Sequence, residues 1–381
     1  MNRLRLFLAA ILAVLACGAI AAEEPAAFLI HDPIGVPMRV RDFTVPSFLV
    51  LGLTAVPAAP LGKGRSAIEL HYSRVNDFQV SPAVERHLAE TRGDVRRRLT
   101  EDDVAFIVGL PDGEGYYIDG EYEFVEIAAH WGLTDRLDVS LAVPYLRFTG
   151  GMLDSIIYRF HDTIGVGQQG RNFVEDDRFQ FVLGANGIVG ANALERPSGG
   201  GFGDPNLYLR YAVPGTHKGW RFNLAGGAKP PFADPDKGLS TGSWDLGLLF
   251  TADRRWRRNA LILNIGIVFP GEFEETRHGM AFDPPTLPSF NVSWLHRFKK
   301  WPNTRLFLQL LTAEHVYSRQ TNSGISDPEF QITVGMKWAT QTGVWGVGLT
   351  ENLFNYDNTP DIAVHLSWGM LFDRPKNQGS L

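Results

Sequence analysis

Cysteine is almost absent from this chain, since Cys17 is the only one in 381 residues. It lies in the N-terminal segment 1–21, where a basic start precedes an apolar run and the small residues Ala19–Ala21, the order found in export signals. Cleavage near Ala22 would leave a mature chain without cysteine, which excludes disulfides and thiol chemistry. A lipoprotein site at Cys17 is the alternative, and the bulky Leu15 argues against it because such sites prefer a small residue there.

Long apolar runs and an excess of positive charge are also missing. After the N-terminal segment there is no run of about 18 apolar residues, and 20% of all residues are charged, which excludes a helical membrane protein. The net charge of −6 argues against a nucleic-acid binder. The chain is instead rich in glycine, with 40 residues, and in aromatic residues, at 12%, a composition that suits an all-β protein.

Segments that alternate large apolar residues with small or polar ones recur along the chain. In 361–372 the residues at even positions from Val364 to Phe372 are large and apolar, and Leu137–Tyr145 repeats the pattern. Alternation with a period of two predicts β-strands. About twelve such segments occur, each near the roughly ten residues that a tilted strand needs to cross a bilayer.

The connections between these segments alternate in length. Short turns are expected at 133–136, 214–219, 254–259, 299–303 and 339–343, and long loops at 76–120, 149–203, 230–242, 270–288 and 314–328. Short turns on one side and long loops on the other are typical of outer-membrane barrels. We therefore predict an all-β fold, a single antiparallel transmembrane β-barrel over 65–372, preceded by a lead or plug at 22–64 and followed by a polar tail at 373–381. The last strand must pair with the first, because unpaired edge amides in hydrocarbon would be costly.

The long loop 149–203 is expected to hold a hairpin and a helix. Asn186-Gly187 predicts a two-residue turn between strands at 179–183 and 188–193. Apolar residues at helical spacing predict a helix within Gly150–Gly165, with Asp154 as its N-cap. This helix could cap or constrict the barrel mouth, fold into the lumen or rest on the membrane surface, and gating of the mouth is the hypothesis that we carry forward. The candidate gate residues are Leu153, Asp154, Ile157, Phe160, His161 and Asp162.

Strand alternation also assigns charged residues to the barrel interior, because a charge on the lipid face near the midplane costs about 2–4 kcal/mol. They form either the two walls of an open polar pore or paired charges in a sealed interior, and the sequence leaves both open. The candidate lumen-lining residues are Glu69, His71, Glu126, His130, Asp138, Arg210, Arg221, Lys229, Asp245, Arg297, Arg305, Glu329, Lys337 and His365.

Chemical motifs are scarce. No HExxH motif occurs, and Ser155 near His161 is a local pairing of a nucleophile with a base. The acidic loop 94–123 could bind calcium, although a solvated loop is the favoured interpretation and its spacing matches no EF-hand. We expect no other cofactor or metal and assign no catalytic residue.

Three stretches carry a resemblance to a known family. GGMLD at 150–154, FHDTIG at 160–165 and GFGDPNLYLRY at 201–211 resemble domain-of-unknown-function family 3187, an uncharacterised group of Gram-negative exported proteins. The resemblance implies an outer-membrane barrel, with no assigned activity and no known functional residues. GFGD and GAKPPF, at 227–232, also resemble solute-channel barrels implicated in the uptake of aromatic compounds.

These observations predict an outer-membrane protein of a Gram-negative bacterium. Passive passage of a small solute is the leading function. A lipid-modifying enzyme and a closed structural or surface-binding barrel are the alternatives. The expected partners are outer-membrane lipid and lipopolysaccharide, the barrel-assembly machinery and an unknown small solute, with no nucleic acid.

Overall fold

The computed structural model describes residues 37–93, 95–165, 167–194, 199–273, 283–317, 324–353 and 359–372. The predicted export signal, residues 22–36 of the predicted lead and the polar tail lie outside these ranges. Among the described residues, no helix is both long enough and apolar enough to cross a membrane.

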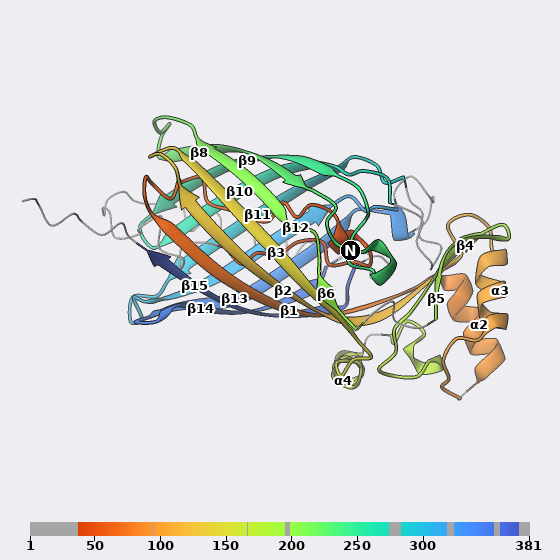
Figure 1. The fold of residues 1–381 in the computed structure, drawn as a ribbon. Helices are drawn as coiled ribbons and strands as arrows, with labels where there is room; N and C mark the ends of the chain where they lie inside the picture. The colour runs from red at the N-terminus through yellow and green to blue at the C-terminus, as the bar shows by residue number, and fades with distance from the viewer. Residues whose placement is uncertain are drawn as a thin grey trace, which may run out of the picture.

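Twelve antiparallel strands form a closed barrel (Figure 1). Each strand pairs with the barrel strands before and after it, and β1 pairs with β15 from Ser66↔Phe372 to Asn76↔Ile362, which closes the sheet as predicted. The barrel strands are β1 (Ser66–Val80), β2 (Tyr116–Gly132), β3 (Leu137–Thr149), β7 (Asn206–Ala212), β8 (Trp220–Lys229), β9 (Asp245–Trp256), β10 (Asn259–Phe269), β11 (Leu287–Arg297), β12 (Thr304–Ala313), β13 (Glu329–Thr340), β14 (Gly343–Asn352) and β15 (Ile362–Phe372).

The outer face of the barrel is apolar, as a transmembrane barrel requires. In β15, Leu366 is 50% exposed whereas its neighbour His365 is 1% exposed, so the alternation separates a lipid face from an inner face. Exposed aromatic residues gather near the short turns, where they form a girdle of the kind found at a membrane interface. They include Trp131, Tyr211, Trp301 and Trp345.

At the loop end, β1 and β2 extend beyond the barrel and carry a small outer subdomain (Figure 1). Its helices are α2 (Pro82–Arg92) and α3 (Glu101–Gly109), and its hairpin is β4 (Gln180–Ala185) and β5 (Ile188–Ala193), with β4 paired to β2. The predicted hairpin is confirmed, and its turn residues Asn186 and Gly187 both have positive φ. A separate apolar core holds the subdomain together; it includes Phe78, Val84, Leu88, Ile107 and Val182.

The acidic loop expected over 94–123 is wrong, because much of this stretch is regular structure. Ser81 and Thr100 cap α2 and α3 with their side chains, and Asp103 completes a capping box at Thr100. Residues 116–123 belong to β2. Capping gives the acidic residues at the start of α3 a structural role, since negative side chains are favourable at a helix N-terminus.

The predicted loop helix is α4 (Asp154–Ile164), and Figure 1 shows it outside the barrel, below β1 and β6. Asp154 is not its N-cap, because the helix begins at Asp154 after Leu153 and has no side-chain cap. Its carboxylate instead accepts hydrogen bonds from Arg171 Nη1 at 2.7 Å and Asn76 Nδ2 at 2.9 Å. The remaining short elements are η2 (Ser47–Leu49), η3 (Arg171–Phe173), β6 (Gly201–Phe202), η4 (Pro235–Lys237) and η5 (Gly324–Ser326).

The lipid face can be tested at Ile265, which lies near the middle of β10, is 54% exposed and pairs with Phe250 and Phe290. We expect Ile265→Arg to lower the free energy of unfolding by about 2–4 kcal/mol, because the charge would face hydrocarbon. Urea unfolding in lipid vesicles measures the change. Leu133→Arg, in an exposed short turn, is the control and should have little effect. Equal effects of the two substitutions would contradict the membrane orientation.

Candidate functional site: an inner segment in the barrel lumen

Residues 37–64, called here the inner segment, run inside the barrel. Near the short turns, Pro37 O accepts a hydrogen bond from Lys337 Nζ at 3.2 Å. At the loop end, Val45 O accepts from the Tyr317 hydroxyl, and η2 reverses the chain. The segment then returns to the short turns, where Leu61 N–H donates to Asp138. It therefore passes through the lumen twice before β1 begins.

Carboxylates on the barrel wall accept hydrogen bonds from the backbone of the inner segment. Irregular backbone at membrane depth needs protein partners, because each unsatisfied amide in a dry interior is costly. Four aspartates on three wall strands, β1, β3 and β9, supply them. The pairs are Val45 N–H to Asp77 at 2.8 Å, Leu51 N–H to Asp245 at 2.8 Å, Ala58 N–H to Asp253 at 2.8 Å and Leu61 N–H to Asp138 at 2.9 Å.

Apolar side chains of the inner segment build a core with the wall. Met38, Phe43 and Phe48 are almost fully buried and pack in one cluster with wall residues such as Phe124 and Phe307. Such packing resembles a protein interior more than a pore lined with water. The inward-facing apolar residues were not part of the predicted lumen, which listed charged positions alone.

Glycines in the wall make room for the inner segment at one point. A Cβ at Gly247 would lie 2.9 Å from Leu51 Cδ2, and a Cβ at Gly227 would lie 3.1 Å from the same atom. Gly227 and Gly247 are directly paired in the sheet. Leu51 therefore occupies a recess that exists because both residues lack side chains.

The fourteen charged candidates all lie on the inner face of barrel strands. Four are half-buried, namely His130, Arg210, Arg221 and Arg297, and the others are buried. Many meet an opposite charge. The pairs include Arg39–Glu126 at 2.6 Å, Arg210–Asp138 at 3.0 Å, Lys229–Asp204 at 3.1 Å and Lys229–Asp245 at 3.4 Å. Sequence patterns did not identify Arg39, Asp204 or Asp253, since the first two precede or interrupt the alternation and the third adjoins a predicted turn.

The gate candidates on α4 lie apart from this lumen site. Leu153, Asp154, Ile157 and His161 are buried and Asp162 is exposed, while the side chain of Phe160 is outside the described structure. Arg171 joins Asp154 to Asp361, which precedes β15, and so ties α4 to the barrel rim. Burial raises the pKa of the Asp361 carboxyl despite the neighbouring Arg171. Gating by 149–203 stays a prediction.

Ser155 and His161, the local pair noted in the sequence without a catalytic assignment, differ in burial, since Ser155 is exposed and His161 is buried. Sequence spacing missed a different set inside the barrel. Ser140 Oγ lies 2.7 Å from His130 Nδ1, and His130 Nε2 lies 3.4 Å from Glu69 Oε2. The three residues come from β3, β2 and β1, so only strand register brings them together. Within the described ranges, no group of three or more His, Cys, Asp or Glu residues could hold a metal ion.

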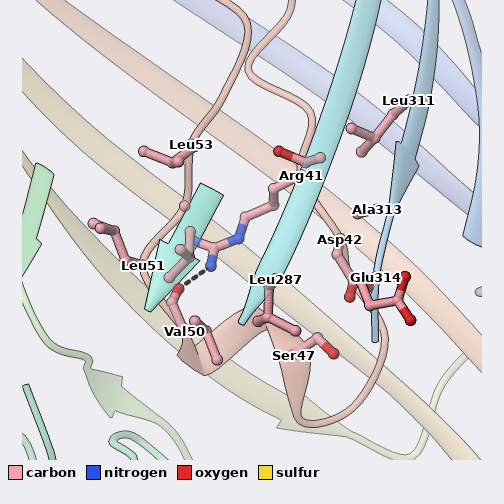
Figure 2. A pocket seen from close by; sticks show the side chains of 13 residues that line it. Arg41, Asp42, Ser47, Val50, Leu51, Leu53, Leu287, Leu311, Ala313 and Glu314 are labelled. Atoms are coloured by element: carbon pink, nitrogen blue, oxygen red, sulfur yellow. Dashed lines mark hydrogen bonds between the residues drawn. The ribbon is translucent and has the colours of Figure 1, made fainter. Parts of the chain in front are cut away.

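Two of the cavities within the described part of the chain lie beside the inner segment. The upper cavity, of about 60 Å³, lies toward the loop end and is shown in Figure 2. Arg41 enters it from the inner segment and donates a hydrogen bond to Val50 O, while Asp42 and Glu314 lie at one side. The lower cavity, of about 30 Å³, is lined by polar residues such as Arg39, Ser140 and Arg210 and by apolar residues such as Leu249.

The buried charge of Lys229 allows a test of this interior. Its ammonium contacts Asp204, Asp245 and the Thr241 hydroxyl, and its side chain is 1% exposed. Lys229→Met would leave two buried carboxylates without a cation, so we expect a loss of about 3–5 kcal/mol in the free energy of unfolding.

Urea unfolding in vesicles measures this loss. Lys237→Met is the matched control, since Lys237 pairs with Asp234 at 3.2 Å on an exposed loop and should contribute about 1 kcal/mol or less. An equally small loss at both positions would show that the Lys229 site is not a buried ion pair.

Several solved structures align with most of this chain at low sequence identity. An outer membrane channel from Pseudomonas putida F1 aligns with a TM-score of 0.49 and 11% identity, over 83% of this chain and 98% of that chain. The CymD monoaromatic hydrocarbon channel has a TM-score of 0.37 and 10% identity, over 82% and 90%. The toluene transporter TodX of Pseudomonas putida has a TM-score of 0.36 and 8% identity, over 88% and 98%. This likeness is one of fold alone.

A family model described as a protein of unknown function (DUF3187) matches residues 97–372. The matched range includes eleven of the twelve barrel strands and leaves out β1 and the inner segment. Among curated proteins, no sequence matches the chain.

Proposed function

The chain belongs to the DUF3187 family of proteins of unknown function, and we propose that it is an outer-membrane channel whose inner segment closes the lumen until a small solute passes. One observation carries the proposal. Within the described residues, the inner segment makes backbone-to-backbone hydrogen bonds to the wall only at its end, where Gly64 N–H donates to Gly132 O at 2.9 Å. The rest of the segment is held by side chains and could leave the lumen without breaking the barrel sheet.

The membrane assignment follows from the apolar outer face and the aromatic girdle, and the predicted export signal supports the outer membrane of a Gram-negative bacterium. Lipid, lipopolysaccharide and the barrel-assembly machinery are then the proposed partners. This proposal includes no bound cofactor. Binding of calcium at acidic outer residues is a separate and weaker proposal. Charged wall residues become accessible to solute as the inner segment moves, whereas in the closed state they bind that segment.

A disulfide between the inner segment and the wall tests the channel directly, because the mature chain contains no cysteine of its own. Leu51→Cys with Gly247→Cys would place the two sulfurs close together, since a Cβ at Gly247 lies near Leu51 Cδ2. We expect discrete openings in a planar bilayer after reduction and silence after oxidation. Each single cysteine variant is a control and should be insensitive to oxidation.

Equal currents in the oxidised and reduced states would contradict gating by the inner segment. Silence in both states, with a folded barrel shown by circular dichroism, would reject the channel. The closed structural barrel would then be the better account, because the inner segment already packs as a core.

The Ser140, His130 and Glu69 set favours a hydrolase as the second candidate function. In such a site the Ser140 hydroxyl would attack an ester carbonyl and pass its proton to His130 Nδ1, while Glu69 orients the ring. A fluorophosphonate reacts with an activated serine, so labelling measures this chemistry. We expect labelling to be lost in Ser140→Ala if the set is catalytic.

Ser73 supplies the matched control. Its hydroxyl also contacts a histidine, His365 Nδ1 at 2.8 Å, but the other ring nitrogen meets Thr350 Oγ1 at 2.7 Å and not a carboxylate. Ser73→Ala should leave labelling unchanged. Absence of labelling in the reduced Leu51→Cys/Gly247→Cys protein, once open, would exclude the hydrolase.

A further inference from the structure

We propose that the lower cavity is a binding site for a small uncharged solute with an apolar body and one acceptor oxygen, and that Leu53 separates this site from the upper cavity. The inference rests on the proposed channel function and names its solute class and its closing side chain. It is carried by the shared lining of the two cavities, by unpartnered donors in the lower one and by the local balance of charge.

Leu53 lines both cavities. In Figure 2 its side chain lies beside the upper cavity, on the arm of the inner segment that returns toward the short turns. Glycines form the wall against it, since a Cβ at Gly266 would lie 3.1 Å from Leu53 Cδ1 and a Cβ at Gly247 would lie 3.3 Å from the same atom. Leu53 is thus the lining residue that these two cavities share, which makes its side chain the candidate for the barrier between them.

The polar lining of the lower cavity offers donors. Arg39 and Arg210 each bind a wall carboxylate, Glu126 and Asp138, yet Arg39 Nη2 and Arg210 Nε are buried and have no hydrogen-bond partner among the described residues. A buried donor left unsatisfied costs roughly 1–3 kcal/mol. An acceptor oxygen on a ligand would recover part of this cost. A cavity of about 30 Å³ also has room for an ordered water, which a solute would displace.

The charges around the cavity argue for an uncharged ligand. Two guanidinium groups, of Arg39 and Arg210, face three carboxylates, of Glu126, Asp138 and Glu69. Each guanidinium is already paired with a carboxylate, Arg39 with Glu126 and Arg210 with Asp138, so an additional anion would find no unpaired cation there. Arginine side chains only donate hydrogen bonds, so Arg39 and Arg210 would offer a cation no acceptor. The apolar lining residues Val56, Ala225 and Leu249 then suit an apolar body.

Size explains why Leu53 must move. The two volumes of about 60 and 30 Å³ are below the roughly 150 Å³ of a cavity that binds benzene. A ring-sized solute therefore fits only when the leucine side chain gives way and joins the cavities. Removing that side chain should relieve the cost of opening and strengthen binding, in proportion to the fraction of open state gained.

The test compares Leu53→Ala with Leu51→Ala in the full-length barrel. Both substitutions remove the same atoms from the inner segment, but Leu51 lines only the upper cavity. Binding of cyclopentanone to the detergent-solubilised protein is measured by calorimetry. We expect Leu53→Ala to bind about tenfold more tightly than wild type, and Leu51→Ala to bind like wild type. Cyclopentanecarboxylate and methylcyclopentane, which add a charge or lack the acceptor, should not bind.

Arg39→Lys in the Leu53→Ala background tests the donor. Lysine keeps a positive charge beside Glu126 and removes the unpartnered Nη2, so we expect the gain in cyclopentanone binding to be lost. Equal binding by Leu53→Ala and Leu51→Ala, or equal binding of cyclopentanone and the carboxylate, would overturn the proposal.

Bilayer current through Leu53→Ala separates the two inferences. Selective binding in a barrel that never conducts would support the site and reject the channel. Conduction without selective binding would support the channel and reject the site.

Discussion

The hydrogen bonds from wall carboxylates to the backbone of the inner segment are the interaction on which the rest of the interior depends. A segment without regular structure has amides at every residue, and inside a membrane barrel no bulk water satisfies them. Asp77, Asp245, Asp253 and Asp138 take this role at successive levels of the lumen. Each aspartate is itself fully or almost fully buried. A buried carboxylate without a hydrogen-bond donor is as costly as a buried amide without an acceptor, so each hydrogen bond satisfies both groups. The apolar packing of Phe43, Phe48 and Leu51 follows only once these polar groups are satisfied.

The same arrangement explains why the lumen carries so many charges although it is largely closed. Arginines and lysines on the wall neutralise the carboxylates, as Arg210 does for Asp138 and Lys229 for Asp245. A water-filled pore wall and a sealed ionic interior are usually alternatives. Here the same wall residues would suit both the closed lumen and a lumen from which the inner segment is displaced. In the closed state the carboxylates bind backbone amides, and after displacement of the segment they would face water, where an exposed ion pair has little net energy.

The alternation of apolar and polar residues, together with the alternation of short turns and long loops, was sufficient to predict the barrel, its strand number and its closure. Lipid on the outer side requires an apolar residue at every second position, such as Val364 and Leu366. The hairpin at Asn186-Gly187 was also predictable, since its turn needs two residues with positive φ. Helices α2 and α3 were missed because they belong to a satellite core above the membrane, where neither lipid nor the barrel period constrains the sequence. Among the site residues, the alternation along each strand identified the inward-facing charged residues but not the residues with which they pair. Arg39 lies on irregular backbone, and Ser140, His130 and Glu69 meet only through register.

The way the inner segment is attached decides whether it is a plug or a movable gate. A strand paired along its length would have a ladder of backbone hydrogen bonds, and its removal would open an edge in the sheet, which hydrocarbon does not tolerate. The inner segment has no such ladder among the described residues, and it joins β1 at the short-turn end of the barrel. Its side-chain contacts can be exchanged one by one for water or solute, while the β1–β15 seam stays closed. Glycines at 227, 247 and 266 complete this arrangement, because the missing side chains leave the space in which Leu51 and Leu53 pack.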